Sequence, residues 1–293
     1  MRGVVTITLW ALNLVVWGIL FLLTILLRFI PDSRPAVTGM LQRIVELWAR
    51  SHARITDVMV GVEWDVKGLE KLSADRNYLI IANHQSWLDI PIIERFLIRR
   101  ISFIRFFAKR ELIWMPIVGA ALWALEMPLV RRYPKELIEK RPELKGRDLA
   151  TTREVCEHFG LRRSESLLSF MEGTRFTRAK HEAQNPPYRN LLRPKLGGVS
   201  LVLAAIGERM DSLLDITIAY PKKGKILWRM ANGELDRVTF EVVEREIPYE
   251  MTGDGLLEDP ERREQFREWI EDIWREKDRK LGAHARGAAD GRE

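Results

Sequence analysis

Cysteine and histidine are scarce in this chain of 293 residues, which contains one cysteine and five histidines. Because Cys156 stands alone, neither an intramolecular disulfide framework nor a cysteine-based zinc site can form. No H-E-x-x-H pattern is present, and we expect neither a metal nor a cofactor. The G-x-S-x-G nucleophile elbow is also missing, which disfavours a serine esterase. If the protein is an enzyme, we therefore expect its catalytic side chains to act without a metal ion and without the serine of a nucleophile elbow.

Long blocks of charge of one sign are also missing. The formal net charge is +6, from 47 Lys and Arg against 41 Asp and Glu, and the two signs are interspersed. A basic balance suits an anionic membrane surface or a phosphorylated substrate. No nucleic-acid-binding module is recognisable, so we expect no nucleic acid as a partner.

Hydrophobic residues are concentrated at the start of the chain, where residues 4–27 carry no charge. About 20 such residues suffice for a helix to cross a bilayer, whereas a signal peptide has a shorter core and a small-residue cleavage site. We therefore predict a retained transmembrane helix. Positive charge is more frequent after the helix than before it, which places the large domain in the cytoplasm. The residues concerned are Arg28, Arg34, Arg43, Arg50 and Arg54, against Arg2.

We divide the chain into a membrane anchor (1–32), a single domain (33–280) and a disordered tail (281–293). A second apolar stretch, residues 112–130, is nearly long enough to span a membrane, but it contains prolines and a glutamate. A crossing there would separate His84 from everything after residue 131. We expect instead a helix pair that packs on the domain or dips into one leaflet.

Predicted strands and helices alternate along the domain. We predict helices over residues 36–56, 86–99, 149–160 and 197–210, a helix from residue 259 onward, and strands over residues 60–67, 78–82, 101–108, 166–171, 213–219, 225–230 and 236–247. Such alternation favours an α/β fold with a largely parallel sheet flanked by helices.

His84 and Asp89 follow one of these strands. Residues 78–82 are predicted to be a buried strand, and Ser86 and Asp89 have the S-x-x-D spacing of a capping box. In the structural interpretation, His84 only ends a strand and Asp89 only caps a helix. In the functional interpretation, Asp89 holds the imidazole in one tautomer while His84 takes a proton from a substrate. Five residues of continuous helix turn by about 500°, so the two side chains can meet only across a turn.

Residues 170–175, Phe-Met-Glu-Gly-Thr-Arg, follow another predicted strand. Gly173 would let the backbone approach a ligand closely, and the planar guanidinium of Arg175 suits a phosphate. The alternative is an ordinary turn with a surface ion pair.

Two more strand ends carry Lys109 and Pro221. Lys109 could bind the same anion as Arg175, or it could be a charge at the membrane surface. Pro221 could shape a site or only end its strand. In open α/β sheets, ligands bind beyond the carboxyl ends of the strands. The shared placement predicts a base with its orienting carboxylate, beside a cationic cradle.

Together these motifs resemble those of the PlsC-type 1-acylglycerol-3-phosphate acyltransferases, a glycerolipid acyltransferase family. The resemblance covers about residues 60–250. Residues 83–89 match the H-x4-D motif, residues 170–175 match F-x-E-G-T-R, and residues 109–132 and 220–221 resemble the second and fourth blocks. The form of residues 172–177 and the insert at 134–150 look like the YihG-like branch. The second block departs from the family, because it ends in Arg131 and Arg132 without an aspartate.

The resemblance implies a glycerolipid acyltransferase-like domain in the inner membrane of a bacterium. The implied reaction moves an acyl group from acyl-CoA or acyl carrier protein to a lysophospholipid, most simply 1-acylglycerol-3-phosphate, without a covalent enzyme intermediate. His84 would be the general base and Asp89 its orienting group. The implied substrate-binding residues are Asn83, Lys109, Arg131, Glu172, Gly173, Thr174, Arg175 and Pro221.

Three other interpretations stay open. The acceptor could be lysocardiolipin, another lysophospholipid with a head group, or an amine lipid. The chain could be a membrane-anchored lipid-binding protein without turnover. It could also be a basic peripheral nucleic-acid binder, which the apolar N-terminus and the scattered charge disfavour.

Overall fold

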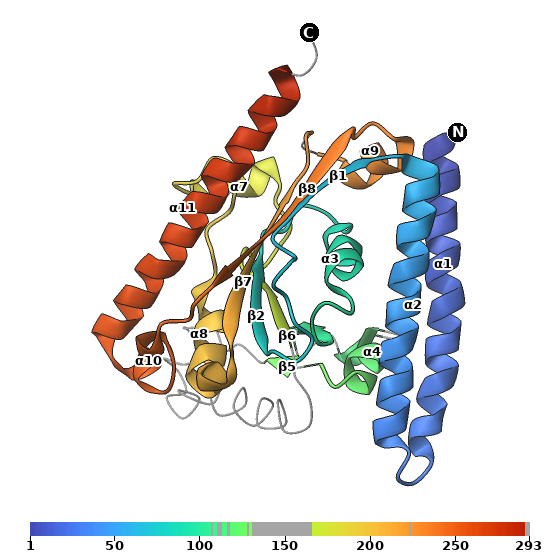
Figure 1. Cartoon of the computed structure of the whole chain (residues 1–293), viewed down its shortest axis with the longest axis horizontal. Helices are drawn as coiled ribbons and strands as arrows, with labels where there is room; N and C mark the ends of the chain where they lie inside the picture. The colour runs from blue at the N-terminus through green and yellow to red at the C-terminus, as the bar shows by residue number, and fades with distance from the viewer. Residues whose placement is uncertain are drawn as a thin grey trace.

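A central sheet lies between two helical layers in the computed structural model, which describes residues 1–106, 108–109, 113–115, 118–127, 129–130, 166–222 and 224–290. Helix α11 runs along one side, and a hairpin of α1 and α2 flanks the other (Figure 1). The strands are β1 (Glu63–Lys67), β2 (Tyr78–Ala82), β3 (Ile104–Phe106), β4 (Ala108–Lys109), β5 (Leu129–Val130), β6 (Ser166–Phe170), β7 (Ser212–Ala219) and β8 (Arg237–Arg245). The α-helices are α1 (Arg2–Ile25), α2 (Arg34–Val60), α3 (Asp89–Leu97), α4 (Val118–Ala124), α7 (Arg178–Gln184), α8 (Leu196–Ile206), α9 (Ile226–Asn232), α10 (Gly255–Glu258) and α11 (Pro260–Asp290).

The main sheet has the order β1-β8-β7-β2-β6-β3, and every pair except β7–β8 is parallel. This confirms the predicted α/β fold. Strand β2 lies between β6 and β7, with Ala82 paired to Phe170 on one side and to Ile216 on the other. Because the three strands run in the same direction, the segments that follow them leave the sheet at one edge.

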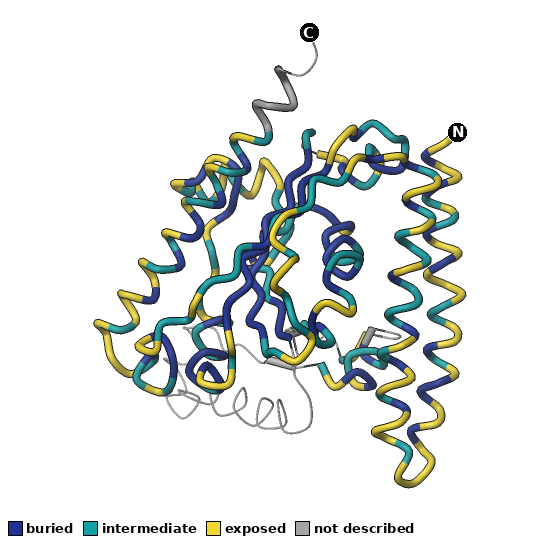
Figure 2. The backbone as a smooth tube through the Cα atoms, viewed as in Figure 1, coloured by how far each residue is buried: buried dark blue, intermediate teal, exposed yellow. Residues whose placement is uncertain are grey.

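The two faces of β2 belong to two hydrophobic cores. Tyr78 and Ile80 pack with α3 and α9, whereas Leu79 and Ile81 pack with α8 and α11. This alternation follows from the two-residue period of a strand. All five residues of β2 are buried, and the central strands form the buried middle of the molecule (Figure 2). Both faces are covered, as an apolar run without polar alternation predicts.

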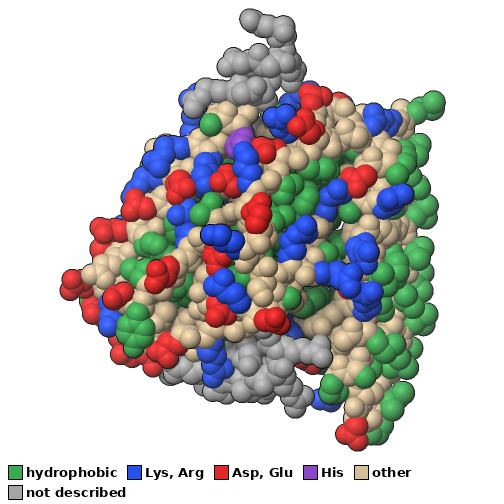
Figure 3. Space-filling model, in the orientation of Figure 1, with side chains coloured by type: hydrophobic (Ala, Val, Ile, Leu, Met, Phe, Trp, Pro, Cys, Tyr) green, Lys and Arg blue, Asp and Glu red, His purple; other side chains and the backbone are tan. Residues whose placement is uncertain are grey.

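Helix α1 packs along α2 through its few polar side chains. Trp10 donates from Nε1 to Thr56 Oγ1 at 3.2 Å, and Ser51 donates to Asn13 Oδ1 at 2.6 Å. The opposite face of α1 is apolar and exposed, and it forms the hydrophobic edge seen in Figure 3. By length and composition, Arg2–Phe29 is a helix able to cross a membrane. Its exposed apolar face favours association with a membrane.

The second apolar stretch forms a short helix in its described part. Helix α4 has seven residues, about 10 Å of rise, which is too short to cross a bilayer. Ala124 and Leu125 pack against Phe21 and Leu41 of the hairpin. In its described part, the stretch is therefore a short helix that packs against the α1–α2 hairpin.

Two predicted segments differ from the structure. Residues 225–230, predicted as a strand, form α9, which ends at Gly233 in the left-handed conformation. A short apolar run cannot distinguish strand from helix by its period, and Leu, Arg, Met and Ala favour helix. The tail was expected to be disordered from residue 281, but α11 continues to Asp290 through an alanine-rich sequence. The helix predicted over residues 149–160 lies outside the described residues, and the division into domains stays a prediction.

A buried ion pair joins α11 to the sheet. Lys277 is only 1% exposed, and its ammonium lies 2.6 Å from Oδ1 of Asp215 on β7. Arg245 of β8 lies 2.9 Å from the other oxygen of the same carboxylate. Burial lowers the pKa of Lys277, and the charge of Asp215 opposes that shift. The Asp215 carboxylate therefore compensates the charge of a lysine that has no access to water.

Replacing Asp215 with alanine leaves the Lys277 charge buried without its counterion. We expect Asp215→Ala to lower the free energy of unfolding by about 3–5 kcal/mol, measured by chemical denaturation in detergent. The double variant Asp215→Leu/Lys277→Met removes both charges and should cost clearly less. Equal costs for the single and double variants would contradict this role of the pair.

Candidate active site

His84 and Asp89 meet across the turn between β2 and α3. His84 Nδ1 lies 2.8 Å from Asp89 Oδ2. The Asp89 side chain is fully buried, while 15% of the His84 side chain is exposed. An ionised carboxylate only accepts hydrogen bonds, so Nδ1 carries the proton and Nε2 keeps a lone pair. The imidazole is thus held in the tautomer that can accept a proton at Nε2.

The Asp89 carboxylate also organises the turn itself. Its Oδ2 accepts from the backbone N–H groups of Gln85 at 2.6 Å and Ser86 at 2.8 Å. The predicted capping box is only half formed, because the Ser86 hydroxyl accepts from Leu88 N rather than from Asp89 N. The carboxylate that orients His84 therefore also fixes the backbone conformation that places His84.

Tyr220 supplies a further hydrogen bond that the sequence did not reveal. Its hydroxyl donates to Asp89 Oδ1 at 2.6 Å from the segment after β7. Burial, with the charge of Asp89 second, raises the pKa of Tyr220 well above its usual value, so the hydroxyl stays protonated as a donor. A tyrosine beside Pro221 at a strand end was the one available signal. Pro221 follows it and is half-buried.

Asn83 joins the end of β2 to β7. Its side-chain amide donates to Ile218 O at 2.9 Å and accepts from Ile218 N at 2.9 Å. Asn83 is fully buried. Its side-chain amide pairs with the backbone of Ile218 in the way that one strand pairs with another, so the buried polar groups have hydrogen-bond partners. The contacts describe a structural role that fixes the start of the His84 turn against the neighbouring strand.

Glu172 links three segments at the same edge. Oε1 accepts from His84 N at 2.7 Å, and Oε2 accepts from Leu192 N at 3.0 Å. Burial raises the pKa of Glu172 to about 7, and the two backbone N–H groups oppose that shift. The imidazole also stacks on Phe170 at a centroid distance of 4.1 Å. The backbone and the ring of His84 are therefore both held from the β6 side.

Gly173, Thr174 and Arg175 complete the loop after β6. Gly173 has φ 63°, and a Cβ there would lie 2.7 Å from Lys195 Cδ. A side chain at this position would thus be strained and would displace Lys195. Thr174 Oγ1 accepts from Lys180 Nζ at 2.6 Å.

Arg175 stands over the ring of Trp87. Its guanidinium carbon lies 4.1 Å from the ring centroid, a cation–π contact that holds the side chain near the His84 turn. Lys195 and Trp87 were missed by sequence reasoning, since both contacts join segments far apart in the chain. Lys109 lies on β4, but its side chain is outside the described part of the structure. Arg131 is outside the described residues altogether.

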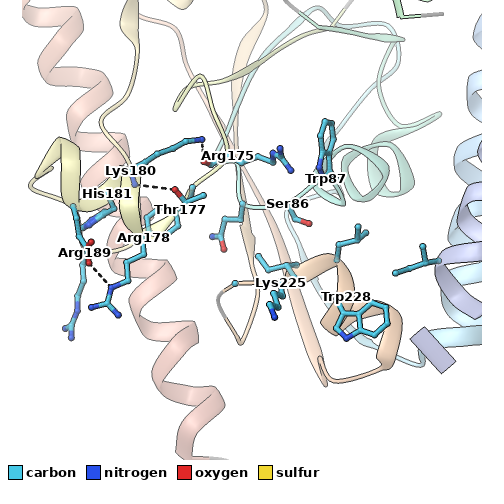
Figure 4. Close-up of a pocket in the computed structure, with 17 residues that line it drawn as sticks. Ser86, Trp87, Arg175, Thr177, Arg178, Lys180, His181, Arg189, Lys225 and Trp228 are labelled. Atoms are coloured by element: carbon cyan, nitrogen blue, oxygen red, sulfur yellow. Dashed lines mark hydrogen bonds and ion pairs between the residues drawn. The ribbon is translucent and has the colours of Figure 1, made fainter. Parts of the chain in front are cut away.

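A cleft of about 1220 Å³ opens beside the turn. Gln85, Ser86 and Arg175 lie in its wall next to the His84–Asp89 pair. Figure 4 shows Arg178, Lys180, His181 and Arg189 on one side, Trp228 on the other, and Ser86 between them. A cleft of this size beside an oriented imidazole can hold substrate against a general base.

Comparison with known proteins identifies the family of the chain. The family model described as Acyltransferase matches residues 63–221, more than half of the chain. The chain belongs to the Acyltransferase family. His84, Asp89, Glu172, Arg175 and the end of β7 all lie within the match.

Relatives of known name support the PlsC-type expectation. The chain is 27% identical to Probable 1-acyl-sn-glycerol-3-phosphate acyltransferase 5 of Arabidopsis thaliana, over 71% of this chain and 54% of that protein. It is 25% identical to Lysocardiolipin acyltransferase 1 of Danio rerio, over 91% and 67%, and 29% identical to 1-acyl-sn-glycerol-3-phosphate acyltransferase of Pseudomonas aeruginosa, over 45% and 45%. The chain therefore spans between 45% and 67% of the length of these relatives.

A solved structure agrees in fold. The crystal structure of the 1-acyl-sn-glycerophosphate acyltransferase PlsC from Thermotoga maritima matches with a TM-score of 0.54 and 17% identity, over 96% of this chain and 97% of that chain. At this identity the likeness supports the fold alone. The membership of the acyltransferase family confirms the resemblance seen in the motifs, while the YihG-like branch stays a prediction.

Glu172 should make the stability of the protein depend on pH. Burial raises its pKa from 4.5 to about 7, so the folded protein binds this proton more tightly than the unfolded chain does. The contribution is fully present below pH 4.5 and is lost as the pH rises through about 7. We expect the stability of the wild type relative to Glu172→Gln to fall by up to roughly 3 kcal/mol over this window, measured by chemical denaturation. The variant Glu70→Gln makes the same substitution at an exposed site and serves as the control. A stability difference for Glu172→Gln that does not change with pH would contradict the shift.

Proposed function

We propose that this protein is a membrane-bound O-acyltransferase that moves a fatty acyl group from a thioester donor to the free hydroxyl of a lysophospholipid. The most direct acceptor is 1-acylglycerol-3-phosphate, which would give phosphatidic acid. The observation that carries the proposal is the 2.8 Å contact between His84 Nδ1 and a buried Asp89, in the turn whose next residues, Gln85 and Ser86, line a cleft together with Arg175. The names of the relatives support the same chemistry.

In the proposed mechanism, His84 Nε2 takes the proton from the acceptor hydroxyl. The alkoxide oxygen attacks the thioester carbonyl, the new ester bond forms, and the carbon–sulfur bond breaks. The imidazolium then returns its proton to the departing thiolate. Asp89 stabilises the imidazolium, and the Tyr220 hydrogen bond holds the carboxylate in place. A general base contributes about 10²–10⁴-fold to such a reaction.

The acceptor phosphate is proposed to bind the guanidinium of Arg175 and the loop at Gly173 and Thr174. The positive φ of Gly173 lets the backbone approach a ligand, and the Trp87 ring keeps Arg175 from turning away. Lys109 and Arg131 are proposed as further phosphate ligands, on the strength of the motif alone. Glu172, Asn83 and Pro221 are proposed to shape the site through the backbone.

Lysocardiolipin is a second candidate acceptor. The lysocardiolipin acyltransferase relative aligns with 91% of this chain, more than the 1-acyl-sn-glycerol-3-phosphate acyltransferases from Arabidopsis thaliana and Pseudomonas aeruginosa do. A panel of acceptors assayed at equal donor concentration would separate the two. A protein that binds these lipids but transfers no acyl group to any of them would instead support the lipid-binding interpretation.

Both ends of α1 contact the catalytic domain. Gly3 lies directly against the side chain of Asn232 on α9, and Arg28, after the other end, pairs with Glu126 at 2.8 Å. A helix that crosses the bilayer would place these ends on opposite sides. We therefore propose that α1 lies along the membrane, with its exposed apolar face in one leaflet and the domain on the cytoplasmic side. This proposal differs from the crossing that hydropathy and the positive-inside bias predict.

Thiol labelling distinguishes the two arrangements. In a Cys156→Ser background, Arg2→Cys and Asp32→Cys place one thiol near each end of α1, at positions outside its apolar face. We expect a membrane-impermeant reagent to label both from the same side of sealed vesicles. Labelling of the two sites from opposite sides would show that the helix crosses the membrane and would overturn the proposal.

His84→Ala should abolish acyl transfer. We expect kcat to fall by about 10²–10⁴-fold in an assay of acyl transfer from acyl-CoA or acyl carrier protein to lysophosphatidate in detergent. Thermal unfolding should change little, because the side chain is partly exposed and its backbone bonds remain. Undiminished transfer by the folded variant would exclude His84 as the base.

Tyr220→Phe should give a smaller loss of activity than His84→Ala. It removes one hydrogen bond to Asp89 but leaves the contacts of Asp89 with His84, Gln85 and Ser86. We expect kcat to fall by about tenfold, the size of one hydrogen bond to a charged group. A loss as large as that of His84→Ala would show that Tyr220 does more than hold Asp89.

A further inference from the structure

The cleft beside the His84 turn extends well beyond the proposed reacting groups. Its volume of about 1220 Å³ exceeds the roughly 300–1,000 Å³ of sites that hold drug-sized ligands. Gln85, Ser86 and Arg175, next to the dyad, lie at one part of its wall. The remaining wall has two chemically different ends. Of their residues, Lys180 also contacts the proposed acceptor phosphate site, because it donates to Thr174 Oγ1 at 2.6 Å.

One end of the cleft is basic. Lys180 and Arg189 come from α7 and the segment after it, and Lys225 comes from the loop after β7. Neither Arg189 nor Lys225 has a carboxylate partner within the described chain, and both side chains are exposed. Arg178 lies there too, but it pairs with Glu182 at 2.8 Å. The cleft wall therefore contains three cations that have no carboxylate partner among the described residues.

The backbone conformation at Lys225 is unusual. Lys225 has φ 49° and follows Gly224 at φ 72°, so two successive residues adopt the left-handed conformation. A lysine in this region is unusual and costs free energy, which proteins accept mainly where function requires it. Figure 4 shows Lys225 between the α7 side and Trp228. The turn holds the ammonium in the wall of the cleft.

The other end of the cleft is apolar. Ile226, Leu227 and Trp228 of α9 line it, together with Ile7 of the apolar helix α1. The thioester would lie between the two ends, beside Ser86 and the His84 turn. A molecule with a long acyl chain at one end, a thioester in the middle and several phosphates at the other matches this order of surfaces.

We infer that the cleft is the donor site and that its basic end, formed by Lys180, Arg189 and Lys225, binds the phosphates of the nucleotide portion of acyl-CoA. Cationic side chains distributed along the wall of one cleft suit the diphosphate and 3′-phosphate of coenzyme A. A protein donor would dock on an outer surface and would send only its pantetheine arm into the site. The inference rests on the proposed function, because it names the donor of that reaction.

Charge reversal at the basic end tests the inference. We would measure binding of free coenzyme A by calorimetry, without turnover, for the wild type, Arg189→Glu, Lys225→Glu and the double variant. The exposed Lys71→Glu makes the same change in net charge as each single variant, outside the cleft, and serves as their control. We expect the double variant to raise the Kd for coenzyme A at least about tenfold, and the control to leave it within about twofold.

Steady-state kinetics show whether the charge reversals weaken binding of the acyl donor or of the acceptor. The double variant should raise KM for palmitoyl-CoA while leaving KM for palmitoyl-pantetheine, which lacks the nucleotide, and for lysophosphatidate unchanged. Absence of coenzyme A binding by the wild type would overturn the inference. So would an equal loss in Lys71→Glu, or a rise in KM for lysophosphatidate alone.

The binding assay keeps this inference separate from the proposed function. If the wild type bound coenzyme A and the double variant did not, while no acceptor was acylated, the proposed function would fail and the nucleotide site would stand. If transfer occurred only from acyl carrier protein and no coenzyme A bound, the proposed function would stand and the nucleotide site would fail.

Discussion

The parallel register of β2 with β6 and β7 decides where every group at the site lies. Ala82 is paired with Phe170 and Ile216, so the residues after these strands emerge at one edge. His84 and Glu172 follow two of the strands closely, and Tyr220 follows the third. Because the two faces of β2 pack into two different cores, a slip of one residue would move each of its side chains into the opposite core and is disfavoured. The fold thereby brings together residues that are up to about 140 positions apart.

Two buried carboxylates turn that edge into a defined site. Asp89 receives bonds from His84, from two backbone N–H groups and from Tyr220, so its buried charge is compensated on both oxygens. Glu172 receives two backbone N–H groups, one of them from His84 itself. A buried carboxylate without such partners would be neutralised or would destabilise the fold. The position of the imidazole is therefore coupled to the integrity of the turn.

The sequence predicted the parts of the site that depend on local pattern. The apolar run of β2, the turn that separates His84 from Asp89, and the polar ends of successive strands could all be read from spacing. The Tyr220–Asp89 bond and the contact of Arg175 with Trp87 could not, because each depends on how distant segments pack. Helix α9 was predicted as a strand for a related reason. Its seven residues are too few for periodicity to distinguish the two, and packing against α1 and α2 favours the helix.

The position of α1 suggests a role for membrane association in substrate binding, in addition to attachment. Each methylene group of an acyl chain that is moved from water to an apolar environment gains about 0.8 kcal/mol, so a long chain leaves hydrocarbon only at high cost. Ile7 of α1 lines the same cleft as Ser86 beside the His84 turn. A helix that lies in one leaflet and also forms part of the cleft wall would let the chain stay in apolar surroundings between bilayer and site. The same exposed face that favours a membrane would then lower the barrier to binding the acyl chain and to releasing the lipid product.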